Sequence, residues 1–224
     1  MNIKKERMGV MLALAEQIDS TIDVEEYLSG ERISKIKHEY VEGQVYAMAG
    51  AKLNHNRLVR NMSALLWDAL KEAPCEPVSS DMLLKTTENH YRYPDVMVIC
   101  DDDSSNDDYV RENPVLIIEV LSKSTRKKDK AEKREEYLAI DSLQEYVLIE
   151  QDFAEIDVQR RSNNWQSSYH FLGDDITFDS INVTVAVEDI YLRVDNDDVQ
   201  QFLAQQQAQL SEENEAVEKE DEES

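Results

Sequence analysis

The sequence predicts an α/β (α+β) fold in which a mixed central sheet is flanked by helices. Two continuous apolar runs, Val96–Cys100 and Val115–Leu121, are typical of strands that are buried on both faces of a sheet. Alternating runs at Glu155–Gln159 and Val183–Val187 indicate added antiparallel strands with one solvated face. A long amphipathic helix is expected at Leu53–Glu72, with an apolar stripe of Leu58, Met62, Leu65, Leu66, Ala69 and Leu70.

The remaining elements are read from caps, turns and periodicity. Asp23 can cap a short helix, Glu42-Gly43 is typical of a hairpin turn, and Pro74 ends the long helix. The order is helix, hairpin, long helix, three strands, helix and strand. The expected bounds are Val24–Ile33, Tyr40–Tyr46, Leu53–Glu72, Glu76–Lys85, Tyr91–Cys100, Val115–Leu121, Thr125 or Asp129 to Ile140, and Glu145–Ile149.

Composition divides the 224 residues into three segments. Residues 1–22 are expected to be a short amphipathic extension and residues 23–194 one folded domain. Residues 195–224 form an acidic, Gln/Glu-rich tail with eleven carboxylates against Lys219 alone. We expect this tail to be a frayed helix that runs into disorder, because it lacks a core-forming pattern.

The charge distribution limits how the protein could bind nucleic acid. The formal net charge is −24, of which −10 lies in residues 195–224, so the folded domain is acidic too. Binding to DNA would therefore depend on a local basic strip and on metal ions. The residues of this basic strip are Lys123, Arg126, Lys127, Lys128, Lys130, Lys133 and Arg134. The same residues also fit a solvated helix face paired with Glu132, Glu135 and Glu136.

Other features argue for a cytoplasmic protein with no membrane segment. No apolar run approaches the roughly 20 residues needed to span a bilayer. Cys75 and Cys100 belong to no CxxC pair, so reduced thiols are expected. The four histidines lie at no zinc-ligand spacing. Among them, His55 fits either a site residue or a cap at the start of the long helix.

Two acidic residues lie at or within the two apolar runs. Asp95 comes directly before the first run, and Glu119 lies near the end of the second. A buried carboxylate costs several kcal/mol unless it is paired or bound to a metal. Two such acids on neighbouring strands, with lysines close by, are suited to hold Mg²⁺ or Mn²⁺ against a phosphate.

The sequence resembles the Uma2 family (DUF820), restriction-endonuclease-like proteins of the PD-(D/E)XK nuclease superfamily. The resemblance covers about residues 23–193, and its helix, three strands, helix and strand match the order derived above. The segments that carry it are His38–Gly50, Asn54–Asn56, Tyr93–Val98, Asn113–Ser122, Ser124-Thr125 with Asp129 and Lys133, and Leu143–Ile149.

The resemblance implies a restriction-endonuclease-like core and a set of site residues. Asp95 and Glu119 would bind the metal, and Glu39 of the hairpin would be a third ligand, although it also fits a hairpin salt bridge. Asp81 is a weaker candidate. The usual catalytic lysine position, two residues after the second acid, holds Leu121. The lysine is then Lys123, two residues further along, or Lys133 on the following helix, which we favour.

The resulting functional hypothesis is a Mg²⁺-dependent endonuclease, a hydrolase that cuts DNA phosphodiester bonds. DNA is the expected substrate, and a homodimer is a candidate assembly. The alternative is a catalytically inactive nuclease-like fold that serves as a binding or regulatory module, which Leu121 and the acidity favour. A third reading is an unrelated β-rich hydrolase or binding domain, in which Asp95 and Glu119 would not be neighbours.

Overall fold

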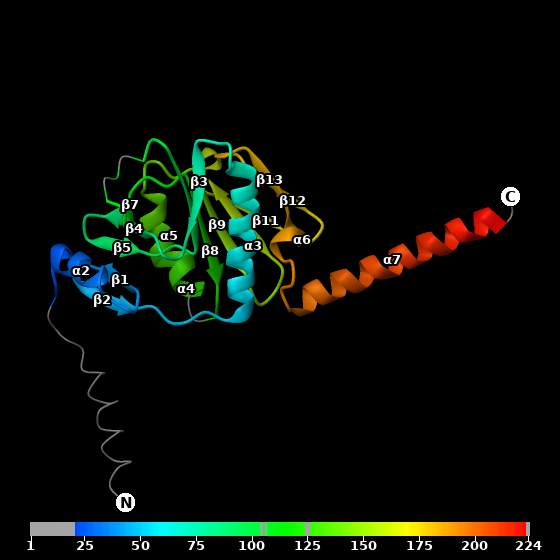
Figure 1. Ribbon diagram of the computed structural model, residues 1–224, viewed down its shortest axis with the longest axis horizontal. Helices are drawn as coiled ribbons and strands as arrows, with labels where there is room; N and C mark the ends of the chain where they lie inside the picture. Colours follow the sequence, from blue (N-terminus) through cyan, green and yellow to red (C-terminus); the bar gives the residue numbers. More distant parts are fainter. Residues whose placement is uncertain (1–20, 104, 106, 124–125, 223–224) are drawn as a thin grey trace, which may run out of the picture. The chain divides into compact units, whose positions relative to one another are not determined.

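A computed structural model describes residues 21–103, 105, 107–123 and 126–222 (Figure 1). The chain forms two compact units, residues 1–48 and 49–224. The proposed N-terminal extension lies mainly outside the described residues.

The first unit contains a capped helix and a hairpin. Helix α2 (Val24–Glu31) begins after Asp23, whose Oδ1 accepts a hydrogen bond from the Glu26 N–H at 2.8 Å. Strands β1 (His38–Val41) and β2 (Gln44–Ala47) pair antiparallel. The two-residue turn has positive φ at both Glu42 and Gly43, which is the geometry that favours tight hairpins. The predicted hairpin is therefore confirmed.

The second unit is built on a six-stranded mixed sheet. Its strand order is β11-β10-β9-β8-β6-β3, with β8 and β9 parallel and the other neighbours antiparallel. The strand bounds are β3 (Cys75–Ser79), β6 (Val96–Cys100), β8 (Leu116–Leu121), β9 (Glu145–Glu150), β10 (Ile156–Arg160) and β11 (Ser167–His170).

Shorter elements surround this sheet. Strand β4 pairs with β5 antiparallel and with β7 parallel, and β12 and β13 form a separate hairpin. Their bounds are β4 (Leu83–Thr87), β5 (His90–Arg92), β7 (Val110–Arg111), β12 (Asp175–Phe178) and β13 (Val183–Ala186), with the 3-10 turn η2 (Arg161–Asn163) after β10 and helix α6 (Val187–Ile190) after β13. The tail contains helix α7 (Asp197–Glu222). Disorder of the tail stays a prediction.

Helices pack on both faces of the central sheet. The α3 helix (Leu53–Leu70) buries Leu58, Met62 and Leu66 against one face, where the even-numbered residues of β6 and β8 point. A helical segment of three parts crosses from β8 to β9 and covers the other face with Tyr137. The parts are α4 (Arg126–Lys128), the π-helical η1 (Asp129–Lys133) and α5 (Arg134–Leu138). The predicted α/β sheet flanked by helices is confirmed.

Two of the expected strands are each divided. The segment 76–85 contains β3 and β4, separated by a turn in which the Met82 N–H bonds to the Ser79 carbonyl. The segment 91–100 contains β5 and β6, separated at Pro94, which has no N–H to donate to a ladder. The division leaves Asp95 at the start of β6, outside the strand proper.

The expectation of reduced thiols is wrong, because Cys75 and Cys100 form a disulfide. They are paired residues at one end of the β3–β6 ladder, and their Cα atoms are 3.9 Å apart. The sequence could not reveal this pairing, because it depends on the register between two strands that are 25 residues apart.

We expect the disulfide to stabilise the fold, because it closes a 25-residue loop in the unfolded chain. The loop-closure entropy corresponds to about 3 kcal/mol. Dithiothreitol should therefore lower the Tm measured by circular dichroism by roughly 10 °C for a domain of this size.

The control is the Cys75→Ala/Cys100→Ala double variant, whose Tm should not respond to dithiothreitol. Two reactive thiols in untreated, denatured wild-type protein, together with an unchanged Tm on reduction, would contradict the expectation.

Candidate active site

The register between β6 and β8 brings Asp95 and Glu119 to the same end of the two strands. Val96 is paired with Ile118, so Asp95, one residue earlier, continues the register opposite Glu119. The Val120 N–H donates to Asp95 Oδ2 at 2.8 Å, which ties the start of β6 to β8. Glu119 alternates along β8 with the same phase as Ile117 and Leu121, which face the apolar cluster that contains Tyr137. The Asp95 carboxylate precedes β6 and is directed at the backbone of β8 and at His55 of α3.

One oxygen of the Asp95 carboxylate is held by its surroundings. Besides the Val120 N–H, His55 Nε2 of α3 lies 3.2 Å from Oδ2. The backbone of Asp95 is fixed as well, because its carbonyl accepts hydrogen bonds from the N–H and hydroxyl of Ser80. Within the described residues, Oδ1 has no hydrogen-bond or ion-pair partner.

The Glu119 carboxylate is also held through only one of its oxygens, and Glu119 is more deeply buried than Asp95. The side chain is 3% exposed, and Oε1 accepts hydrogen bonds from Lys133 Nζ at 2.9 Å and from the Tyr137 hydroxyl at 2.8 Å. No partner for Oε2 is found in the part of the chain that the structure describes. Each acid thus has one oxygen held by two groups and one oxygen left over.

Burial dominates the protonation of Glu119. Desolvation raises the pKa of this carboxyl from 4.5 to about 8. The positive charge of Lys133 lowers the pKa in part, whereas the carboxylates of Asp95 and Asp129 raise it further. A divalent cation beside Glu119 would relieve this crowding of negative charge.

The π-helical turn η1 supplies the groups that face Glu119. Lys133 ends η1, and its Nζ also lies 3.3 Å from Asp129 Oδ1 at the start of the same segment. Tyr137 follows one turn later on α5 and is fully buried. Nothing in the sequence alone assigned a role to Tyr137. The signal that could have revealed it is its spacing, four residues after Lys133.

The two candidate lysines have different positions. Lys133 is buried and bonded to Glu119, whereas Lys123 is exposed beyond the end of β8. Leu121, in the usual lysine position, is fully buried in the apolar cluster beneath α5. Of these two lysines, only Lys133 contacts a candidate metal ligand within the described residues.

The other candidate ligands are less clearly placed. Glu39 is a buried residue of β1 in the first unit, and its part in a metal site stays a prediction. Asp81 is exposed in the turn between β3 and β4. Among the described residues, no group of three or more histidine, cysteine, aspartate or glutamate side chains is arranged to hold a metal ion.

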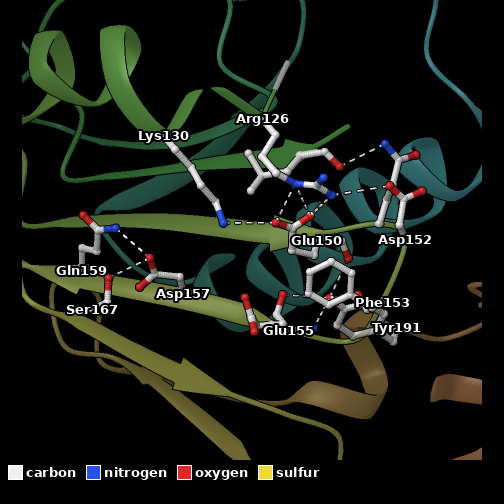
Figure 2. Close-up of polar contacts among 12 residues, drawn as sticks. Arg126, Lys130, Glu150, Asp152, Phe153, Glu155, Asp157, Gln159, Ser167 and Tyr191 are labelled. Atoms are coloured by element: carbon white, nitrogen blue, oxygen red, sulfur yellow. Dashed lines mark hydrogen bonds and ion pairs between the residues drawn. The ribbon is translucent and has the colours of Figure 1, made fainter. Parts of the chain in front are cut away.

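The basic strip is largely engaged within the fold. Figure 2 shows Arg126 and Lys130 converging on Glu150, a carboxylate at the end of β9 that is 2% exposed. Arg126 Nε lies 3.0 Å and Lys130 Nζ lies 3.2 Å from Glu150 Oε1. Arg134 donates to Gln159 Oε1 at 2.7 Å. These three cations of the strip therefore contact polar groups within the fold.

Comparison with known proteins gives relatives and a fold neighbour. Uncharacterized protein slr1290 of Synechocystis sp. is 34% identical over 171 residues, which is 75% of this chain and 90% of that protein. Uncharacterized protein sll1609 of the same organism is 43% identical over 129 residues, which is 56% of this chain and 73% of that protein. The crystal structure of "a putative nuclease belonging to DUF820" from Anabaena variabilis covers 76% of this chain and 97% of its own, with a TM-score of 0.62 and 15% identity.

That structure shares the fold of this chain, a mixed sheet flanked by helices. No helix in the described part of the chain is long and apolar enough to cross a membrane. The Uma2 family model, described as "Putative restriction endonuclease", matches residues 24–187. The chain therefore belongs to the Uma2 family.

Proposed function

We propose that the protein is a metal-dependent endonuclease that hydrolyses DNA phosphodiester bonds. The observation that carries the proposal is a pair of carboxylate oxygens, Asp95 Oδ1 and Glu119 Oε2, that have no partner among the described residues and belong to residues at the same end of the β6–β8 ladder. The family description supports nucleic acid as the substrate class.

The donor set fits Mg²⁺ or Mn²⁺. Hard oxygen ligands select these ions, and Mg²⁺ is commonly held by one or two carboxylates together with substrate phosphates. Asp95 and Glu119 would hold the ion. When bound, a divalent cation supplies positive charge against the phosphate and makes nearby water more acidic. Lys133, which donates a hydrogen bond to Glu119, would stabilise the negative charge that develops on the phosphate.

The acidic composition of the protein is consistent with phosphate binding by a metal cation together with Lys133. The basic strip is partly used inside the fold, so broad electrostatic attraction of DNA is not available to the protein. Phosphate binding would depend on the cation and Lys133, so substrate affinity should be weak and should change little with salt, because few phosphates are neutralised by cationic side chains.

An inactive binding module is the second candidate. Both acids have polar partners already, Asp95 with His55 and Glu119 with Lys133. If these pairs satisfy the acids fully, the fold needs no cation. The two candidates differ in one property, which is affinity for a divalent ion.

We expect calorimetric titration to detect one Mn²⁺ site that is lost in Asp95→Ala. Below pH 8 a proton competes with the ion for Glu119, because the pKa of this carboxyl is raised to about 8. Affinity should therefore rise by up to about tenfold per pH unit from pH 6 to pH 8 and then level off. Glu119→Gln is the control, and it should bind weakly at every pH.

Equal affinity in wild-type protein and Asp95→Ala would favour the inactive module. Strong but pH-independent binding would show that Glu119 does not hold the competing proton.

For the lysines we expect unequal losses of activity. Lys133→Ala should lower Mn²⁺-supported cleavage of plasmid DNA by about 10²–10³-fold, the scale for removal of one preorganised transition-state stabiliser. Lys123→Ala is the matched control and should retain most of the rate, because this side chain is exposed beyond β8. Small and equal losses in both variants would exclude either lysine from catalysis.

A further inference from the structure

The buried hydroxyl of Tyr137 contacts the same oxygen of Glu119 as Lys133 does. The hydroxyl lies 2.8 Å from Oε1, and Lys133 Nζ lies 2.9 Å from it. Two donors on one carboxylate oxygen fix the rotation of the carboxylate, since both lone-pair directions of that oxygen are used. The orientation of the second oxygen, Oε2, is set as a consequence.

The two donors differ in rigidity. Lys133 has a long flexible side chain and divides its charge between Glu119 and Asp129, whose Oδ1 lies 3.3 Å from Nζ. Tyr137 has only two side-chain torsions, and its ring packs edge-on against Tyr146 with centroids 5.5 Å apart. The tyrosine is therefore the donor that can hold one fixed direction.

We propose that Tyr137 is a positioning residue that holds Glu119 Oε1, so that Oε2 stays directed at a cation shared with Asp95. Tyr137 acts through Glu119 and does not touch the substrate. This role rests on the proposed metal-dependent function, which it deepens by identifying what orients one of the two ligands. It requires only that the hydroxyl donates a hydrogen bond.

The chain provides a matched control in Tyr146. This tyrosine is also fully buried and belongs to the same ring pair, but its hydroxyl donates to the backbone carbonyl of Asp129 at 3.0 Å. Tyr137→Phe and Tyr146→Phe each remove one buried hydroxyl and leave the ring in place. Of the two, only Tyr137→Phe removes a donor from Glu119.

The experiment measures the Mn²⁺ dissociation constant of the full chain by calorimetry, together with plasmid cleavage as a function of Mn²⁺ concentration. Tyr137→Phe should weaken Mn²⁺ binding by about tenfold, the lower end of the loss seen when a hydrogen-bond partner of a metal ligand is removed. Tyr146→Phe should bind Mn²⁺ as wild type does. Saturating Mn²⁺ should restore cleavage in Tyr137→Phe, but not in Asp95→Ala.

A purely structural role for Tyr137 would give a different result. Equal Mn²⁺ affinity in Tyr137→Phe and wild type, or equal weakening in both tyrosine variants, overturns the positioning role and leaves the proposed function standing. Equal Mn²⁺ affinity in wild type and Asp95→Ala overturns the proposed function and the positioning role with it. Circular dichroism melts of both tyrosine variants verify that each is folded at the assay temperature.

Discussion

The pairing register between β6 and β8 is the constraint on which the candidate site depends. Because Val96 lies opposite Ile118, Asp95 and Glu119 are the next residues along the two chains at this end of the ladder. A slip of one residue would turn Glu119 toward the opposite face, where α3 packs an apolar cluster. The hydrogen bond from the Val120 N–H to Asp95 Oδ2 joins the two strands at the site itself. The same interaction therefore joins the two strands and orients a candidate ligand.

The helical segment α4–η1–α5 supplies the positive charges that compensate buried carboxylates of the central sheet. A buried carboxylate without a partner costs several kcal/mol, and two of the buried carboxylates are Glu119 of β8 and Glu150 at the end of β9. The segment α4–η1–α5 supplies Lys133 to the first and Arg126 with Lys130 to the second. These cations therefore contribute to charge balance inside a protein whose formal net charge is −24.

The sequence predicted the parts of the fold that depend on local pattern. Continuous apolar runs predicted β6 and β8 as buried neighbours, and periodicity predicted α3. Asp95 and Glu119 were found because a charge stands out in such a run. Lys133 came from the resemblance, since it reaches the site from a separate element.

Features that depend on three-dimensional register were missed. The disulfide requires the pairing of Cys75 with Cys100 across two strands. The π-helical turn η1 has no distinct composition, yet it sets the phase at which Lys133 and Tyr137 face Glu119. The break between β5 and β6 had a local signal in Pro94, but the surrounding apolar residues masked it.

The most direct test of the shared-cation site is a crystal structure of the protein grown with Mn²⁺, with anomalous diffraction used to locate the ion. The account predicts one strong anomalous peak within coordinating distance of both Asp95 Oδ1 and Glu119 Oε2. It predicts that Glu119 Oε1 keeps its contacts with Lys133 and Tyr137. No peak at these carboxylates, with Mn²⁺ bound only along the acidic tail, would contradict it.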